Sequence, residues 1–232
     1  METDSPADVR IFSKPGLVLI DNQIGFTHPT HWGVHRSNPS YEENLGHLLS
    51  AFRDRGHPIF HVAHHSTDPN SPLNPISNPL GAHFLSFAEP HEGEPVFIKT
   101  VNSSFIGTTL EKAIREADIK ELFVAGLTTD HCVSTTTRMG ANLGVVGETG
   151  EIYVVGDAVA NFERGKWDAE TVHQVNLASL DGEFAAIIST EGVIRSLQNW
   201  CVPYISTSFI EFSSYHDITD DITDATNIST YP

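Results

Sequence analysis

Three side chains with different chemistry lie at the ends of apolar, strand-like segments. Asp21 follows "GLVLI", Lys99 ends "EPVFIK", and Cys132 comes shortly after "ELFVAG". A thiol with a pKa of about 8.5 is mostly protonated at neutral pH, but a helix N-terminus and a nearby ammonium both stabilise the thiolate. A carboxylate can take the thiol proton and later pass it to a leaving group. These residues therefore predict acyl transfer, with Cys132 as nucleophile, Lys99 as stabilising cation and Asp21 as acid and base.

Each of the three also has an ordinary structural interpretation. An Asp after a strand is commonly a turn former, a Lys there is commonly a solvated charge, and a free Cys is commonly a small buried hydrophobe. The combination favours chemistry, because acyl transfer needs all three groups together. The segment "GLTTDHC", residues 126–132, adds a turn at a helix start whose backbone N–H groups can stabilise an oxyanion. His131 is a weaker candidate for the base, since neighbouring residues at a helix start point away from each other.

The apolar pattern predicts the elements that must position these residues. Six nearly continuous apolar runs are typical of strands buried on both faces: residues 16–21, 58–65, 94–99, 121–126, 151–158 and 184–189. Amphipathic, helix-like segments lie between them at residues 40–56, 107–119, 131–144 and 168–182. This alternation predicts an α/β fold with a parallel sheet and helices on both faces. Ligands of such sheets bind beyond the carboxyl ends of the strands, which is where the three reactive residues lie.

Composition narrows the class of protein. A formal net charge of -17 over 232 residues argues against nucleic acid or an anionic membrane as a partner. The two cysteines exclude a fold built on disulfides, and Cys201, beside Trp200, is interpreted as buried packing. No apolar run approaches the roughly 20 residues that cross a bilayer, and the first ten residues do not form a signal peptide. We therefore expect a cytoplasmic protein.

The contexts of Asp21 ("LVLIDNQIGF"), Lys99 ("FIKTVNSSFIGTTL") and Cys132 ("VAGLTTDHCVSTTTR") resemble the Asp-Lys-Cys triad of the isochorismatase-like cysteine hydrolases. The resemblance runs from Gly16 to about Ile194. It implies a three-layer α/β/α fold around a six-stranded parallel sheet, and a homodimer or homotetramer. It also implies a cis peptide before Thr128, with the N–H groups of Thr128 and Cys132 forming the oxyanion hole. No cofactor is expected.

The resemblance leaves the branch of the family open. A metal-binding branch has an Asp-x-His pair after its second strand, whereas this chain has only His61, His64 and His65 there, so we predict no metal site. Isochorismatases that cleave a vinyl ether typically lack the cysteine, and Cys132 therefore favours hydrolysis of a small amide or ureide through a thioester. Cleavage of isochorismate to 2,3-dihydro-2,3-dihydroxybenzoate and pyruvate is the alternative. A non-catalytic binding module on the same fold is the alternative of another class.

Aromatic side chains are candidates for the walls of a pocket that holds a small, flat substrate. Phe26, Trp32 and Phe105 follow the strands that carry the acid and the amine, and rings of this kind stack on planar groups. Core packing is the equally ordinary interpretation of all three.

The chain is expected to form one hydrolase domain, residues 1–199, followed by an acidic extension, residues 200–232. The extension is predicted to pack on the domain or on a neighbouring subunit. Within the domain, the loop at 66–94 is long enough to predict a functional role or a dimer contact.

Overall fold

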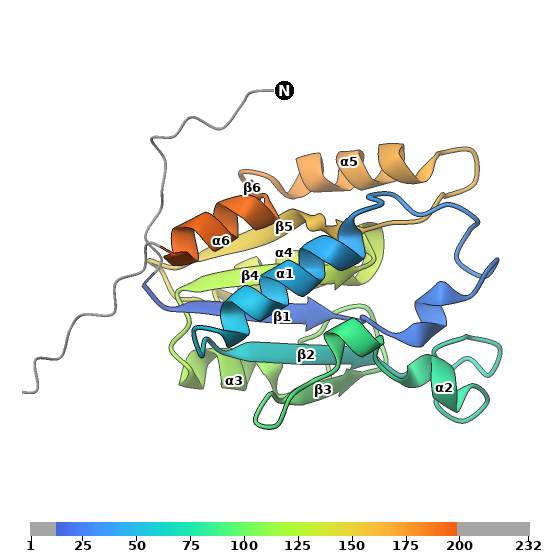
Figure 1. Cartoon of the computed structure of the whole chain (residues 1–232), viewed down its shortest axis with the longest axis horizontal. Helices are drawn as coiled ribbons and strands as arrows, with labels where there is room; N and C mark the ends of the chain where they lie inside the picture. Colours follow the sequence, from blue (N-terminus) through green and yellow to red (C-terminus); the bar gives the residue numbers. More distant parts are fainter. Residues whose placement is uncertain (1–12, 199–232) are drawn as a thin grey trace, which may run out of the picture. The chain divides into compact units, whose positions relative to one another are not determined.

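The predicted apolar runs form the strands of one sheet in the computed structural model, which describes residues 13–198 (Figure 1). The strands are β1 (Pro15–Ile20), β2 (Ile59–His64), β3 (Val96–Lys99), β4 (Glu121–Leu127), β5 (Glu151–Ala160) and β6 (Ala186–Ile188). They lie in the order β3-β2-β1-β4-β5-β6, and every neighbouring pair is parallel. The prediction of an α/β fold with a six-stranded parallel sheet is confirmed.

Helices follow the strands as the amphipathic segments predict, with differences in detail. The α-helices are α1 (Tyr41–Arg53), α2 (Pro79–Ala82), α3 (Leu110–Glu116), α4 (Ser134–Leu143), α5 (Ala169–Leu180) and α6 (Thr190–Gln198). Helix α6 was not predicted. The long loop at 66–94 contains α2 and a short 3₁₀ turn, η2 (Ser86–Ala88). Two further turns matter for the site: the 3₁₀ turn η1 (Ile24–Thr27) and the π-helical turn η3 (Thr129–Val133).

The fold has three layers, which are the sheet and a layer of helices on each of its faces. A hydrophobic core lies between the sheet and each helical layer. Alternate residues of a strand point to opposite faces, so Leu17 and Leu19 of β1 join one core while Val18 and Ile20 join the other. The first core includes buried residues of α1 and α6, and the second includes buried residues of α3 and α5. Figure 1 shows α1 and α6 together on one face of the sheet. All six residues of β1 are buried, as expected for a central strand between two helical layers.

The strand order places a switch point beside β1. From β1 the chain continues outward through β2 and β3, and it then returns to add β4, β5 and β6 on the other side. Open parallel sheets bind ligands in the crevice at such a point. The two strand ends approach closely there, because Gly126 pairs with Ile20, has a φ of 125°, and leaves no room for a side chain: a Cβ would lie 2.0 Å from the carbonyl oxygen of Ile20.

Two predictions concern residues outside the described range. The acidic extension, residues 200–232, and Cys201 both lie beyond residue 198. Between residues 13 and 198, no helix is both long enough and apolar enough to cross a bilayer.

Candidate active site

Asp21 stands directly after β1, at the switch point of the sheet. Its φ of 54° puts the backbone in the left-handed region, which Asp tolerates better than most residues. The Asp21 amide donates to the carbonyl of Val62 over 2.9 Å, which holds this turn against β2. The side chain is fully buried. One carboxylate oxygen, Oδ2, accepts a hydrogen bond from Lys99, while Oδ1 has no hydrogen-bond partner among the described residues.

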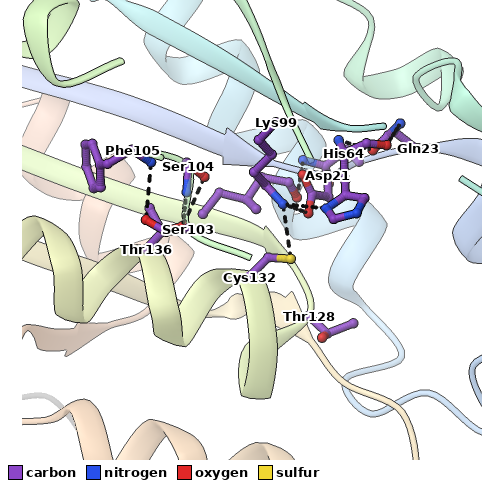
Figure 2. Close-up of polar contacts among 12 residues, drawn as sticks. Asp21, Gln23, His64, Lys99, Ser103, Ser104, Phe105, Thr128, Cys132 and Thr136 are labelled. Atoms are coloured by element: carbon purple, nitrogen blue, oxygen red, sulfur yellow. Dashed lines mark hydrogen bonds and ion pairs between the residues drawn. The ribbon is translucent and has the colours of Figure 1, made fainter. Parts of the chain in front are cut away.

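Lys99 ends β3 and sends its ammonium into the centre of the site. Its Nζ lies 2.7 Å from Asp21 Oδ2, 3.2 Å from Cys132 Sγ and 3.0 Å from Nδ1 of His64 (Figure 2). The side chain is fully buried. Burial alone would lower the pKa of Lys99, but the negative charge of Asp21 and the hydrogen bonds to Asp21 and Cys132 raise it above its usual value. The residue is therefore a fixed positive charge at neutral pH.

Cys132 lies in the turn η3, between the end of β4 and the start of α4. The peptide bond Leu127–Thr128 before this turn is cis, as the resemblance implied. Cys132 is buried, with its sulfur on the Lys99 ammonium. Burial raises the pKa of the Cys132 thiol, the charge of Asp21 raises it further, and Lys99 opposes both effects without overcoming them. The expectation of a stabilised thiolate is therefore corrected, because desolvation and the neighbouring carboxylate favour the protonated thiol in the resting site.

His64 is a site residue that the sequence analysis considered only as a metal ligand. It ends β2 and pairs in register with Lys99, so the two side chains lie next to each other. Gln23 holds the backbone on both sides, since its Oε1 accepts from the His64 amide and its Nε2 donates to the His64 carbonyl. His61 is three residues before His64, so strand alternation puts it on the other face of the sheet, where it contacts Glu94 and Phe84. The position of His64 at a strand end, like that of Lys99, is the signal that could have placed it in the site.

A pocket of about 260 Å³ has Asp21, His64 and Cys132 in its lining. Phe26 and Trp32 line it and stack on each other with ring centroids 4.6 Å apart, and the Trp32 ring is fixed by a hydrogen bond to the carbonyl of Gly25. The structure does not bring Phe105 to this pocket. Phe105 belongs to the second core and packs against Gly140 of α4, because the segment after β3 is tied to α4 by the hydrogen bond from the Ser104 amide to Thr136.

A charged group on the pocket wall connects three segments of the chain. Arg164 donates to both carboxylate oxygens of Asp130, over 2.7 and 3.2 Å, and also contacts Nδ1 of His131 and the carbonyl of Trp32. Burial alone would raise the pKa of Asp130, but hydrogen bonds from His131 and Arg164 hold it well below its usual range. The guanidinium is therefore fully engaged within the protein. His131 faces Asp130 and Arg164, in keeping with its ranking as the weaker candidate for the base.

The same residues include a ligand set of the kind that divalent metals prefer. One ligand atom each from Asp21, His64 and Cys132 lie within 4.8 Å of one another. The Lys99 ammonium, however, is hydrogen-bonded to all three residues. A metal ion could use this set only if the lysine side chain moved away.

Comparison with known proteins identifies the family. The sequence profile described as "Isochorismatase domain" matches residues 15–192. The chain belongs to the isochorismatase family. It is an isochorismatase-family hydrolase whose matched region contains all of β1 to β6 and the Asp21, Lys99 and Cys132 constellation.

Individual relatives agree with this assignment. The uncharacterized isochorismatase family protein YrdC of Bacillus subtilis is 38% identical over 187 residues, which cover 78% of this chain and 95% of the relative. A crystal structure described as a hydrolase of the isochorismatase family, from Chromobacterium violaceum, is 37% identical with a TM-score of 0.76, and the match covers 84% of this chain and all of that one. An N-carbamoylsarcosine amidase from an Arthrobacter species is 25% identical over 80% of this chain and 72% of its own.

Proposed function

We propose that this isochorismatase-family hydrolase cleaves the C–N bond of a small amide or ureide through a thioester on Cys132. The observation that carries the proposal is the buried Lys99 ammonium, which is hydrogen-bonded to the carboxylate of Asp21 and to the sulfur of Cys132, two residues that line the pocket. The amidase among the relatives supports the reaction class.

The first half of the reaction forms the thioester. The thiol keeps its proton in the resting site, so Asp21 removes it as Cys132 Sγ attacks the substrate carbonyl carbon. Asp21 Oδ1, which is buried and without a hydrogen-bond partner among the described residues, is the oxygen available for that proton. The carbonyl oxygen becomes an oxyanion held by the N–H groups of Thr128 and Cys132. The C–N bond then breaks, and Asp21 returns the proton to the leaving nitrogen.

The second half releases the acid. Asp21 takes a proton from a water molecule, the water oxygen attacks the thioester carbonyl carbon, and the same N–H groups stabilise the new oxyanion. The C–S bond breaks, Cys132 recovers a proton from Asp21, and a carboxylic or carbamic acid leaves. Lys99 remains charged throughout and stabilises negative charge on sulfur and on Asp21.

The pocket favours a small substrate without a strong negative charge. Its volume of about 260 Å³ suits a small molecule, and the Phe26 and Trp32 rings offer a flat apolar wall. Asp21 and Asp68 contribute carboxylates to the lining, while the cation that lines it, Arg164, is already engaged by Asp130. This charge distribution disfavours the dianion isochorismate. The ammonium at the centre of the Asp21, His64 and Cys132 set also supports a metal-independent reaction.

The test is ammonia release from a panel of small amides and ureides, with isochorismate included and pyruvate measured. Cys132→Ala should abolish ammonia release, by about 10⁴-fold or more, because the nucleophile is lost. Pyruvate formation that survives in Cys132→Ala but not in Asp21→Ala would contradict the proposal and support vinyl-ether cleavage. The absence of turnover, together with a Cys132 that does not react with an alkylating reagent, would support a binding module.

A further inference from the structure

The Lys99 ammonium has three hydrogen-bond acceptors, one for each of its protons. Asp21 Oδ2 and Cys132 Sγ are two of them, and Nδ1 of His64, at 3.0 Å, is the third. An ammonium on a flexible four-carbon chain has no preferred direction of its own, so its acceptors determine where each proton points. With three acceptors around it, the proton that faces the sulfur has a fixed direction (Figure 2).

Neither ring nitrogen of His64 is available as a base for Cys132. Nδ1 accepts from the Lys99 ammonium, which can only donate, so the neutral ring carries its proton on Nε2. Burial and the positive charge of Lys99 lower the pKa of His64, with Asp21 opposing, so the ring is neutral as this tautomer demands. His64 is therefore equipped to accept from Lys99 and not to take the thiol proton.

The backbone of His64 is fixed as firmly as its ring. The register of β2 and β3 sets it opposite Lys99. The buried side chain of Gln23 accepts from the His64 amide over 2.8 Å and donates to its carbonyl over 3.1 Å. Because Gln23 is two residues after Asp21, the acid and the His64 acceptor are held by the same turn.

We propose that His64 is a positioning residue, which directs the Lys99 ammonium onto the sulfur of Cys132 by accepting its third hydrogen bond. In metal sites, a residue that does not bind the metal often orients a ligand that does. His64 acts in a comparable way here, because it orients the Lys99 ammonium that contacts Cys132. This inference rests on the proposed function, because it assigns a role in activating Cys132.

The test is the rate at which iodoacetamide alkylates Cys132 at neutral pH, followed on the Cys132 peptide by mass spectrometry. His64→Leu removes the acceptor and should slow alkylation by about tenfold or more, since outer partners of this kind typically contribute 10- to 100-fold. His64→Asn places an amide oxygen close to the position of Nδ1 and should recover most of the rate. The matched control is His65→Leu, which changes the neighbouring histidine, a residue that lines a different pocket and should leave the rate unchanged.

A second readout separates positioning from a merely structural role. On any amide that the parent enzyme hydrolyses, His64→Leu should lower kcat by a larger factor than it raises KM, because His64 contacts Lys99 beside the nucleophile although it also lines the pocket. A His64→Leu variant that matches His65→Leu in alkylation overturns the inference, even where amide hydrolysis depends on Cys132. Slower alkylation in His64→Leu supports it, even where no amide in the panel is hydrolysed. If His64→Leu does not fold, His64→Asn and His64→Gln are compared instead. Only His64→Asn should keep most of the alkylation rate of Cys132, and an equal loss of rate in both variants overturns the inference.

Discussion

Strand β2 contains two histidines, His61 and His64, and each belongs to a different polar cluster. The Cys132 cluster consists of Asp21, His64, Lys99 and Cys132, and the Glu94 cluster consists of Arg53, His61 and Glu94. Each cluster combines a carboxylate, a cation and a histidine. The clusters differ in how completely the carboxylate is hydrogen-bonded.

The Glu94 carboxylate is satisfied at both oxygens. Arg53 donates to Oε1 and Oε2 over 2.8 Å each, and Oε2 also contacts His61 Nε2 at 2.7 Å and the His91 amide at 2.9 Å. Such a bidentate pair connects α1, β2 and the end of the 66–94 loop. Asp21, in contrast, leaves Oδ1 without a partner among the described residues. A saturated carboxylate stabilises the fold, whereas the unsatisfied oxygen of a buried carboxylate remains available for a proton.

The largest effect is expected from removing the cation of the Cys132 cluster. Lys99→Met leaves Asp21 buried and unpaired, so the free energy of unfolding should fall by about 3–5 kcal/mol and amide hydrolysis should be lost. The double variant Asp21→Asn, Lys99→Met removes both charges and should recover most of the stability but none of the hydrolysis. Urea unfolding and ammonia release measure the two properties. A single variant as stable as the parent would show that the pair does not stabilise the fold.

A smaller effect, on stability alone, is expected in the Glu94 cluster. Glu94→Gln should lower the free energy of unfolding by about 2 kcal/mol, the contribution of hydrogen bonds to a charged group, and should leave amide hydrolysis within about twofold. Glu92→Gln, at an exposed neighbouring position, is the matched control for urea unfolding. Lost activity in Glu94→Gln at full stability would remove the distinction between the two clusters.

The same cluster predicts how stability depends on pH. Burial alone would raise the pKa of Glu94, but hydrogen bonds from Arg53, His91 and His61 lower it from 4.5 to about 2. The pKa of Glu94 is lower in the folded state than in the unfolded state. The ionised carboxylate therefore stabilises the fold fully above about pH 4.5, and this stabilisation is lost as the pH falls toward 2. The difference in urea midpoint between the parent and Glu94→Gln should therefore shrink over that range. A difference in urea midpoint that stays constant over this pH range would contradict the lowered pKa of Glu94.

The smallest effects should separate a pocket wall from the core. Phe26→Leu removes part of the apolar wall and should raise KM for a hydrolysed amide by about tenfold. Phe105→Leu, a matched change in the second core, should leave KM unchanged and lower the free energy of unfolding by about 1 kcal/mol. Steady-state kinetics and urea unfolding on both variants test this. An equal rise in KM would place Phe105 in the pocket after all.

The sequence predicted those parts of the site that depend on strand ends. Asp21, Lys99 and Cys132 each follow an apolar run, and parallel strands bring their carboxyl ends to one edge of the sheet. The family resemblance added the cis bond before Thr128, a feature that no local pattern indicates. The predicted strands overlap those of the structure, because buried parallel strands have nearly continuous apolar sequences.

Features that depend on tertiary pairing were not predictable in the same way. The sequence places His64 near a strand end, but its contact with Lys99 depends on the pairing of β2 with β3, and the sequence did not indicate that register. Phe105 was predicted to line the pocket because its ring could stack on a flat substrate, whereas it lies in the second core, next to the hydrogen bond from Ser104 to α4. The raised pKa of Cys132 follows from burial, which the helix-start argument did not include.

Gly126 shows that the distance between Asp21 and Cys132 can depend on the absence of a side chain between two strands. Gly126 on β4 pairs with Ile20 on β1, and it allows the two backbones to approach closely. Asp21 comes directly after Ile20, and Cys132 comes six residues after Gly126. Any larger residue would force the strand ends apart and widen the gap between Asp21 and Cys132. A survey of tolerated substitutions would then group Gly126 with the reactive side chains, although it has no functional group, and a design that transplants this site must transplant the glycine too.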